Sequence, residues 1–533
     1  MIILYGVPLV FHQLPNNFDT LSESFEPIKT LKFAHSKGRA FHKWGPMPSF
    51  IYAPLYAPLM AYWSLHGDLR QISTTYPYGF RRPFEQQGAL IALARSAGVL
   101  IAVVCIGLYG RALTRMTGSR LAVFLALLLC VTTSPRLVFD FVSTKPDGLM
   151  LAFLAGSMAV YTDVIGRGLT RRRGFLLSLL AVASMSCKEL TAALYLPLYA
   201  GLGLWGAARP VRERDERRRF LIDYVFTIGV GVIAYLLINV VYAPATWRLR
   251  VAEWLLGPGK DPAVWAPPNY STPAYLRDAL ADVLGNLGIG GVAIVAITLL
   301  ITLVAPVRNR LLLWVPAAGF AMIVIVSAGY LPDYFFSPLN VAVALPVAVA
   351  LAYAGAAWAP RASSAVRGAA LAFVSVLCLI NAWTATSVWA RASLSVPSLV
   401  ERYCRLHVSP RELIHTANLW VRQPGAHRLS YLGFDVDDRP LGEIMAHPPR
   451  MPDVILISRP SLAWLEDFKL RPARDAMMGA TGYRYKDFPG FGALGYRIVA
   501  VVEPRVPRLL DFPWVRDLCT RPGSSLLVFR RVP

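Results

Sequence analysis

Long apolar stretches recur along the first three quarters of this chain and constrain its fold more than any other feature. A helix that crosses a bilayer needs about 20 mainly apolar residues. Seven stretches meet this requirement plainly: 121–138, 148–165, 220–243, 286–305, 311–331, 336–358 and 369–390. Another stretch, 88–110, is long enough and carries Arg95 in its first third. The pattern predicts an α-helical polytopic membrane protein.

Two further segments bring the predicted number of transmembrane helices to eleven. Residues 174–207 are apolar except for Lys188 and Glu189, and the stretch is too long for one span. We interpret it as two short helices with the charged pair at the tip between them. The chain opens with MIILYGVPLVFHQL, which lacks the basic start and the small-residue cleavage site of a signal peptide. We interpret this segment as a first transmembrane helix, whose shortness a late start codon would explain.

Positive charge falls on alternate connections between these spans. Seventeen arginines and only three acidic residues lie in five short loops, 111–120, 166–173, 208–219, 306–310 and 359–368. In the intervening series, the three short connections hold only Lys145 and Lys188 as basic residues. Loops rich in Lys and Arg face the cytoplasm. The alternation therefore predicts a cytoplasmic N-terminus and an extracytoplasmic C-terminal region.

Composition supports a membrane protein over a soluble one. The chain is 55% hydrophobic and 16% charged, against roughly 45–50% and about 25% in soluble domains. This apolar content excludes a disordered chain. The net charge of +22 would be typical of a nucleic-acid-binding protein, but the cytoplasmic loops account for most of it. We therefore expect membrane lipid, and no nucleic acid, as a partner.

Three parts of the chain are predicted to lie outside the membrane on the far face. They are the loop 13–87, the loop 244–285 and a soluble domain at 395–533. The membrane domain is 1–394 and includes both loops. The soluble domain contains the strand-like runs HRLSYLGF, PDVILISR, GYRIVAVV and SSLLVFRR, and the helix-like run SLAWLEDF. This pattern predicts a small α/β domain. Its two cysteines, Cys404 and Cys519, form a disulfide or stay free, and the sequence leaves both outcomes open.

Eight ionisable residues lie within or at the ends of the predicted spans, where charge is expensive and usually functional. Asp163 and Asp223 lie near the cytoplasmic ends beside arginines, so we expect local ion pairs. The other six gather toward the outer face: Arg95, Asp140, Asp147, Lys188, Glu189 and Asp333. A functional site at that face would explain the cluster. The alternative is that each residue is an interfacial group in contact with water.

The first outer loop adds two acids and a lysine. Asp19 and Glu23 are four residues apart and share a face if their segment is helical. They belong either to a surface helix whose acids lie in water or to a site in which a carboxylate takes a proton or holds a metal. The later run FHKWGPMPSFIYAPLYAPLMAYW contains Lys43. It fits an interfacial segment with an aromatic belt, or a groove for a lipid tail with a cation for its phosphate.

The order of these motifs resembles the GT-C superfamily of integral-membrane glycosyltransferases, in particular the branch of protein O-mannosyltransferases and lipid A aminoarabinose transferases. NNFDTLSE supplies the acidic pair of the first outer loop, and FHKWGPMPSF is similar to a Lys-Pro-Pro element. ALARSAGVL contains the Ala-Arg pair of the next span. TTSPRLVFDFVSTKPDGLM places Asp147 after a Ser-Pro turn, and ASMSCKELTAAL ends a span with Lys188.

The resemblance implies transfer of a sugar from a polyprenyl-phosphate donor to a hydroxyl of a glycan, lipid or protein at the outer face. Asp19 would be the general base, and a single displacement would invert the anomeric carbon. Glu23 and Asp147 would orient the acceptor or assist Asp19. Asp19 and Asp147 are also candidates to hold a divalent metal ion, the one cofactor considered. The donor phosphate would be bound by Lys43, Arg95 and Lys188. The expected location is the bacterial inner (plasma) membrane.

The chain also departs from the motifs of this superfamily. Trp44 and Gly45 interrupt the Lys-Pro-Pro element, and Asp333 stands where a basic residue is usual. Both changes bear on the donor and its phosphate contacts.

The main alternative function is that of a transporter or flippase, since eleven spans with buried charge fit that class too. Transporters often show internal repeats and charge near the bilayer midplane, whereas this chain shows no repeat and carries its charge at one face. An assembly protein without chemistry of its own is a further alternative.

Overall fold

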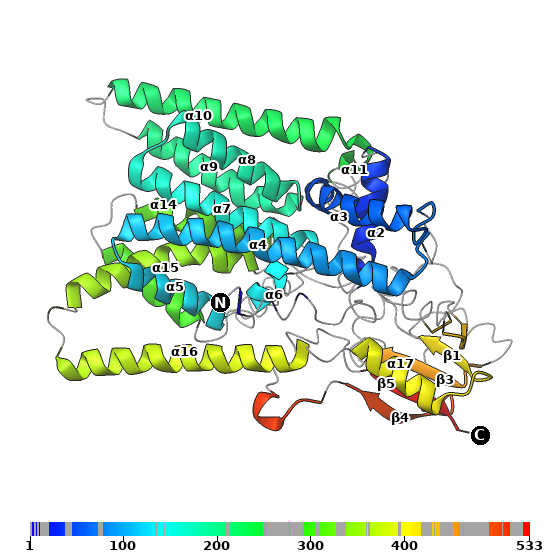
Figure 1. Cartoon of the computed structure of the whole chain (residues 1–533). Coiled ribbons are helices and arrows are strands. Elements are labelled where there is room, and N and C mark those ends of the chain that lie inside the picture. The colour runs from blue at the N-terminus through cyan, green and yellow to red at the C-terminus, as the bar shows by residue number, and fades with distance from the viewer. Residues whose placement is uncertain are drawn as a thin grey trace.

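The computed structural model describes residues 21–37, 45–72, 78–133, 136–142, 144–208, 214–248, 291–304, 310–326, 337–358, 363–392, 396–416, 432–437, 451–458, 490–503, 505–511 and 526–532, with a few single positions between them. These residues form a bundle of long helices and a small β-sheet beside one end of the bundle (Figure 1). Among the described helices, five are long and apolar enough to cross a membrane.

Helix α7 (Pro146–Arg167) forms the centre of the bundle because almost every residue on it is apolar and small or medium-sized. It packs along α4 (Pro83–Thr117), α8 (Arg171–Met185) and α15 (Ser337–Trp358). Small residues such as Gly156 permit close approach, since a β-carbon there would lie 3.4 Å from Cys105 of α4 and from Leu180 of α8. Helices without a hydrophobic driving force between them associate through such close packing.

The other helices surround this centre. Their bounds are α2 Leu21–His35, α3 Met47–Leu65, α5 Arg120–Thr133, α6 Arg136–Val142, α9 Ala192–Ala207, α10 Arg214–Tyr235, α11 Pro244–Trp247, α14 Arg310–Val326 and α16 Ser364–Ala392. Residues 291–304 are also helical. At its end α10 continues as a π-helix over Leu236–Val241.

Most predicted spans are confirmed as helices in the described part of the chain. The stretch 174–207 forms α8 and α9, with the short 3₁₀ turn Glu189–Thr191 between them, so the hairpin prediction is confirmed. The stretch 121–138 is different, because α5 ends at Thr133 and α6 begins at Arg136. The sequence between them includes Pro135, which has no N–H to continue a helix. At the N-terminus, the described positions 3, 4, 7 and 10 are helical.

The two ends of the bundle differ in charge. The connections α4–α5 and α7–α8 and the first turns of α10 and α16 lie at one end, and these are the arginine-rich segments (Figure 1). Two ion pairs tie helices together there, Arg115 Nη1 to Asp163 Oδ2 at 3.2 Å and Arg171 Nε to Asp223 Oδ1 at 3.4 Å. The predicted local pairing of these two aspartates is confirmed. The hairpin tip, α6 and the sheet lie at the opposite end.

The C-terminal part forms a five-stranded mixed sheet in the order β2-β1-β3-β5-β4. Its strands are β1 Leu413–Thr416, β2 Asp435–Asp437, β3 Val454–Ser458, β4 Tyr496–Val502 and β5 Leu526–Arg531. Strands β2, β1 and β3 are parallel, whereas β5 runs antiparallel to β3 and β4. Helix α17 (Val396–His407) covers one face through Val400 and Cys404. A second apolar cluster with Phe491 and Phe529 lies on the other face.

The small α/β domain predicted from the sequence is confirmed in outline. PDVILISR, GYRIVAVV and SSLLVFRR contain β3, β4 and β5. The prediction of a strand over HRLSYLGF is wrong, because its described residues 429 and 430 are helical and β2 begins only at Asp435. Strand β1 was not predicted, since LIHT is too short to show a clear period. The run SLAWLEDF lies outside the described residues except for Leu462.

Cys404 is a free cysteine buried between α17 and the sheet. Burial raises the pKa of its thiol to about 12, so the group stays protonated at neutral pH. Cys519, its possible disulfide partner, lies outside the described residues.

Candidate functional site

Asp147 lies in the first turn of α7 at the end of the bundle that carries the sheet. Pro146 occupies the first helical position, where its fixed backbone angle and missing N–H are well tolerated. The partial positive charge of the helix N-terminus favours a carboxylate at this position. Asp147 is nevertheless almost fully buried. A carboxylate removed from water in this way requires a specific partner.

That partner is Lys188 at the tip of the α8–α9 hairpin. Its Nζ lies 2.7 Å from Asp147 Oδ1, and the two side chains are only 5% and 8% exposed. Lys188 follows the last turn of α8, so its charge also lies where a helix C-terminus favours a cation. Both residues were predicted to lie near the outer face of the membrane, with separate roles. The structure brings them together as a buried ion pair.

Three segments far apart in the sequence hold the hairpin tip, residues 186–188. The N–H of Gly45 donates to the carbonyl of Cys187 at 3.2 Å, and the N–H of Met47 donates to the carbonyl of Ser186 at 3.1 Å. From the π-helix, Asn239 Nδ2 donates to Ser186 Oγ at 2.7 Å. Asp147 of α7 binds the tip through its ion pair with Lys188. The position of Lys188 is therefore fixed by α7, by the start of α3 and by the end of α10.

Gly45 is required at its position by this close approach. A β-carbon on residue 45 would lie 1.8 Å from the carbonyl oxygen of Ser186, which is backbone and has little freedom to move. The glycine that interrupts the Lys-Pro-Pro element thus has a structural reason. It lets the segment that follows Lys43 and Trp44 reach the backbone beside Lys188.

A second group of buried polar residues lies around α6. Ser337, the first residue of α15, donates to Asp140 Oδ2 at 2.5 Å. Arg95 of α4 is buried and donates through Nη1 to the carbonyl of Val10 at 3.3 Å. Helices α4 and α6 touch where a β-carbon on Gly98 would lie 3.3 Å from the carbonyl of Phe141. Arg95 is one helical turn from that contact, and Asp140 is the neighbour of Phe141.

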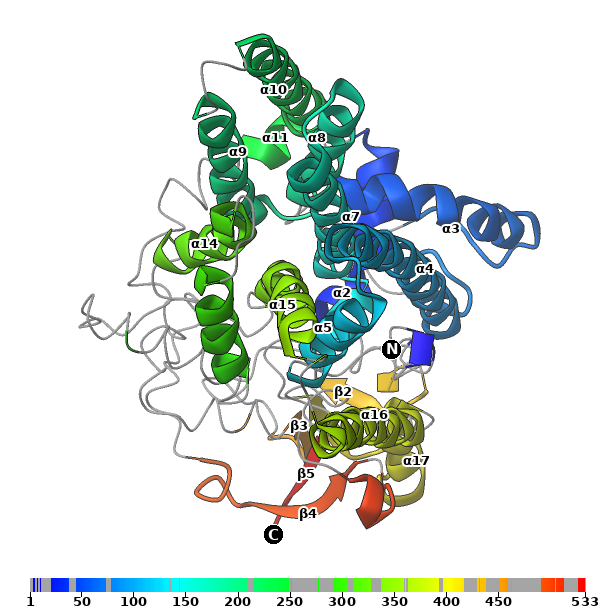
Figure 2. The ribbon, with the colours of Figure 1, turned by 90° about the vertical axis from the view of Figure 1, so that its left-hand side faces the viewer.

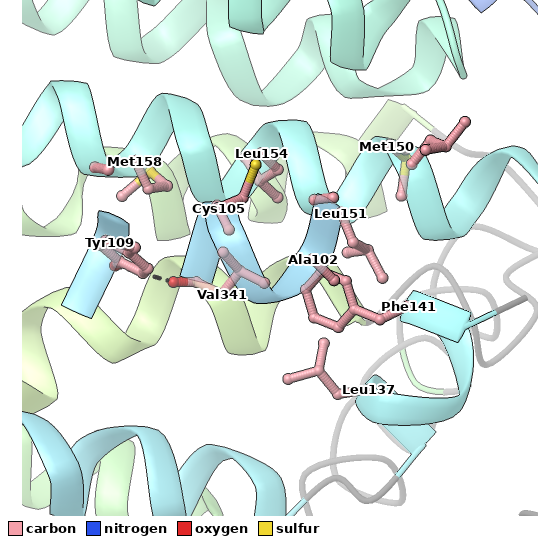
Figure 3. Close-up of a cluster of buried hydrophobic side chains, with 14 of the residues drawn as sticks. Ala102, Cys105, Tyr109, Leu137, Phe141, Met150, Leu151, Leu154, Met158 and Val341 are labelled. Atoms are coloured by element: carbon pink, nitrogen blue, oxygen red, sulfur yellow. Dashed lines mark hydrogen bonds between the residues drawn. The ribbon is translucent and has the colours of Figure 1, made fainter. Parts of the chain in front are cut away.

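An apolar cavity of about 290 Å³ begins beside this group. Its walls come from α4, α5, α6, α7 and α15, and include Val103, Ile106, Leu127, Val131, Leu137, Phe141, Ala155 and Ala344. Leu137 and Phe141 of α6 reach toward the apolar cluster formed by α4, α7 and Val341 of α15 (Figure 3). The hydroxyl of Tyr109 is bonded to the carbonyl of Val341 at 3.1 Å, which leaves Asn340 as the most polar wall residue.

Several predicted site residues cannot be placed. Asp19 and Lys43 lie outside the described residues, as does Asp333. Glu23 is in the first turn of α2, but its side chain is not among those described. One turn further on, Glu26 is buried, and its Oε1 lies 3.5 Å from Lys29 Nζ. Among the described residues, no three His, Cys, Asp or Glu side chains are grouped so as to hold a metal ion.

The structural roles of Gly45, Asn239 and Glu26 were not predicted from the sequence. The signal for Asn239 was a lone amide within an otherwise apolar span, since a buried amide must find partners. The signal for Glu26 was an acid on the face of α2 that also carries Thr30 and Phe33 toward the core. Gly45 stood out only as a departure from the Lys-Pro-Pro element, because its contact is made with residues about 140 positions away.

No protein-family model matches the chain, and no curated protein matches it. Two solved structures have a similar course of the chain, namely crystal structures of ArnT from Cupriavidus metallidurans bound to undecaprenyl phosphate and in the apo state. Both are 13% identical to this chain, with TM-scores of 0.48 and 0.46, and the match covers 99% of this chain and 96% of the other. The function proposed for this chain rests on its own residues.

Proposed function

We propose that this protein is a membrane glycosyltransferase that moves a sugar from a polyprenyl-phosphate donor to an acceptor hydroxyl at the membrane surface. The observation that carries the proposal is the grouping of buried charged residues at one end of the helix bundle, directly beside an apolar cavity. A lipid phosphate has the same two parts, a long apolar chain and an anionic head. The sequence motifs resemble enzymes that use such donors.

The cavity would accept the lipid part of the donor, and the buried cations would bind its phosphate. Its apolar walls suit part of an isoprenoid chain, and its α6 end lies close to Arg95. Arginine is the residue best suited to bind phosphate through paired hydrogen bonds. Lys188, and Lys43 two residues before Gly45, are the further cations that we assign to the phosphate.

In the reaction, the acceptor hydroxyl attacks the anomeric carbon of the sugar. The bond from that carbon to the phosphate oxygen breaks, and the polyprenyl phosphate leaves with the electron pair. Asp19 takes the hydroxyl proton, so that a single displacement inverts the anomeric carbon. The cations stabilise the phosphate charge that develops in the transition state.

The Asp147–Lys188 pair has a consequence for the roles of its members. Asp147 Oδ1 is already engaged by the buried ammonium of Lys188 at 2.7 Å, which leaves this oxygen badly placed to reach an acceptor hydroxyl. We therefore assign Asp147 to positioning Lys188 and leave the general base at Asp19. The phosphate of the donor would share the ammonium with Asp147 when it binds.

The proposal is tested by incubating the purified protein with a panel of labelled polyprenyl-phosphate sugars and acceptor membranes. Transfer of the sugar, with release of polyprenyl phosphate, is the expected result. A folded protein that releases no polyprenyl phosphate with any donor contradicts the proposal. Movement of an intact lipid-linked sugar across vesicle membranes would then favour a flippase.

The role of Asp19 is tested by Asp19→Asn. We expect sugar transfer to fall by about 10²-fold or more, because general base catalysis contributes roughly that much. Asp68→Asn is the matched control in the same outer loop, since Asp68 forms exposed ion pairs with Arg81 and Arg82. Its transfer rate should stay close to wild type. Full activity of Asp19→Asn would remove this residue from the mechanism.

A further inference from the structure

A short turn of the C-terminal domain, residues 505–511, lies directly against the long helix α16. It contains the 3₁₀ turn Arg508–Leu510. Trp383 Nε1 donates to the carbonyl of Leu509 at 2.9 Å, and Ser387 Oγ donates to the carbonyl of Leu510. The turn lies on the side of α16 that faces away from the other helices, and the two views agree (Figures 1 and 2).

The contact on α16 lies within the part of this helix that is apolar enough to cross a membrane. That part is Arg367–Ala390. Twenty residues cover the hydrocarbon thickness of about 30 Å, so a span counted from Arg367 ends near Ser387. Trp383 lies four residues deeper, which is about 6 Å. The turn is therefore at the depth where acyl chains meet headgroups.

The surface of the turn fits this depth. Leu509 is 75% exposed, and no other described helix of the bundle lies on its side of α16. Arg505 and Arg508 precede it in the same turn and are exposed as well. An exposed leucine that directly follows basic residues is typical of segments that place an apolar side chain among acyl chains and their basic groups among lipid phosphates. Trp383, whose indole is half exposed, is typical of the same layer.

The neighbouring edge strand extends this apolar surface. Ile498, Val499 and Val501 of β4 are exposed, and β4 leads directly into the turn. An exposed apolar edge strand is a liability for a domain in water. Beside a membrane the same residues face an apolar or interfacial solvent.

We propose that residues 505–511 insert into the leaflet on the side of the C-terminal domain and anchor that domain to the membrane surface. The occupant of this surface is bilayer lipid, with Leu509 among the acyl chains. Arg505 and Arg508 bind headgroup phosphates. Because α16 and the turn are joined by two hydrogen bonds, the domain is held at a fixed height above the bilayer.

The test places an environment-sensitive NBD label on Leu509→Cys in the full-length protein. Leu406→Cys is the matched control, because Leu406 on α17 is a leucine of the same domain that is 65% exposed, against 75% for Leu509. Both proteins are reconstituted in lipid nanodiscs with and without doxyl-labelled phosphatidylcholine, which quenches NBD only within the bilayer. Unsubstituted protein carried through the same labelling gives the background from native cysteines.

We expect blue-shifted emission at position 509, and quenching there at least three-fold stronger than at position 406. Both substitutions are at exposed positions, and a single symmetric gel-filtration peak confirms that each variant is folded. Quenching at 509 that is no stronger than at 406 overturns the proposal. This outcome would leave the proposed glycosyltransferase reaction unaffected, since the label reports depth and not transfer.

Discussion

The Asp147–Lys188 pair joins two charges that are both shielded from water. Removing water from an ion costs several kcal/mol, and the partner offsets this loss. Either residue alone would be a buried charge without this partner. The pair thus makes the hairpin tip and the start of α7 depend on each other.

We predict that Lys188→Met lowers the free energy of unfolding by about 3–5 kcal/mol, because it leaves Asp147 buried without its ammonium. The double variant Asp147→Leu/Lys188→Met should recover most of this stability, since no charge remains. Thermal unfolding in detergent measures both effects.

Sugar transfer separates function from stability in the same set of variants. The double variant should remain inactive although it is folded, because the phosphate has lost Lys188. An active double variant would limit the pair to a structural role.

Gly45 permits a second prediction at the residue scale. Gly45→Ala should displace the start of α3 from the hairpin tip, because the added carbon would overlap the Ser186 carbonyl. Gly107→Ala is the control, since nothing lies within 4 Å of a β-carbon there and alanine is favoured over glycine inside a helix by up to about 1 kcal/mol. We expect the melting temperature to fall for the first variant and to stay or rise for the second. Equal melting temperatures would contradict the required close approach.

At the scale of elements, the π-helix Leu236–Val241 carries a buried amide toward the hairpin tip. π-helical turns often occur at functional positions in helices. Asn239→Leu should loosen the tip by removing the bond to Ser186 Oγ. We predict a KM for the donor raised several-fold, because Lys188 is then less well positioned. Steady-state transfer kinetics provide the measurement.

Asn381→Leu is the control for this variant. Asn381 is also buried and donates at 2.8 Å to Thr132 Oγ1, a bond that joins α16 to α5 and not to the tip. It should lose stability while retaining the KM of the wild type. The same change in KM for both asparagines would show that the effect is one of general destabilisation.

Elements of this chain could be predicted because their signals are local. Apolar length predicted the helices, Lys188 and Glu189 marked the hairpin tip, and strand-like runs located β3, β4 and β5. The contacts that position Lys188 could not be predicted in the same way. They join residues 45, 147 and 239 to residues 186–188, and a single sequence holds no record of which distant residues touch.

At the scale of the whole molecule, the arginines of the connecting segments and the buried charges occupy opposite ends of the bundle (Figure 1). We expect the first group to fix the orientation of the chain in the membrane, as the alternation along the chain predicts. The second group lies partly at the hairpin tip and partly around α6, beside the cavity. Asp19 and Lys43 complete the predicted set, and their roles remain proposals.

The contacts that hold the hairpin tip also set an order of events during synthesis. A ribosome produces Gly45 and Asp147 before Lys188, but Asn239 emerges some fifty residues after it. A nascent chain can therefore form the ion pair as soon as α8 and α9 are inserted, whereas the third hold on the tip has to wait for the end of α10. Maturation of this site thus depends on the insertion of α10, and a chain released before residue 239 would carry its charges without the geometry to use them.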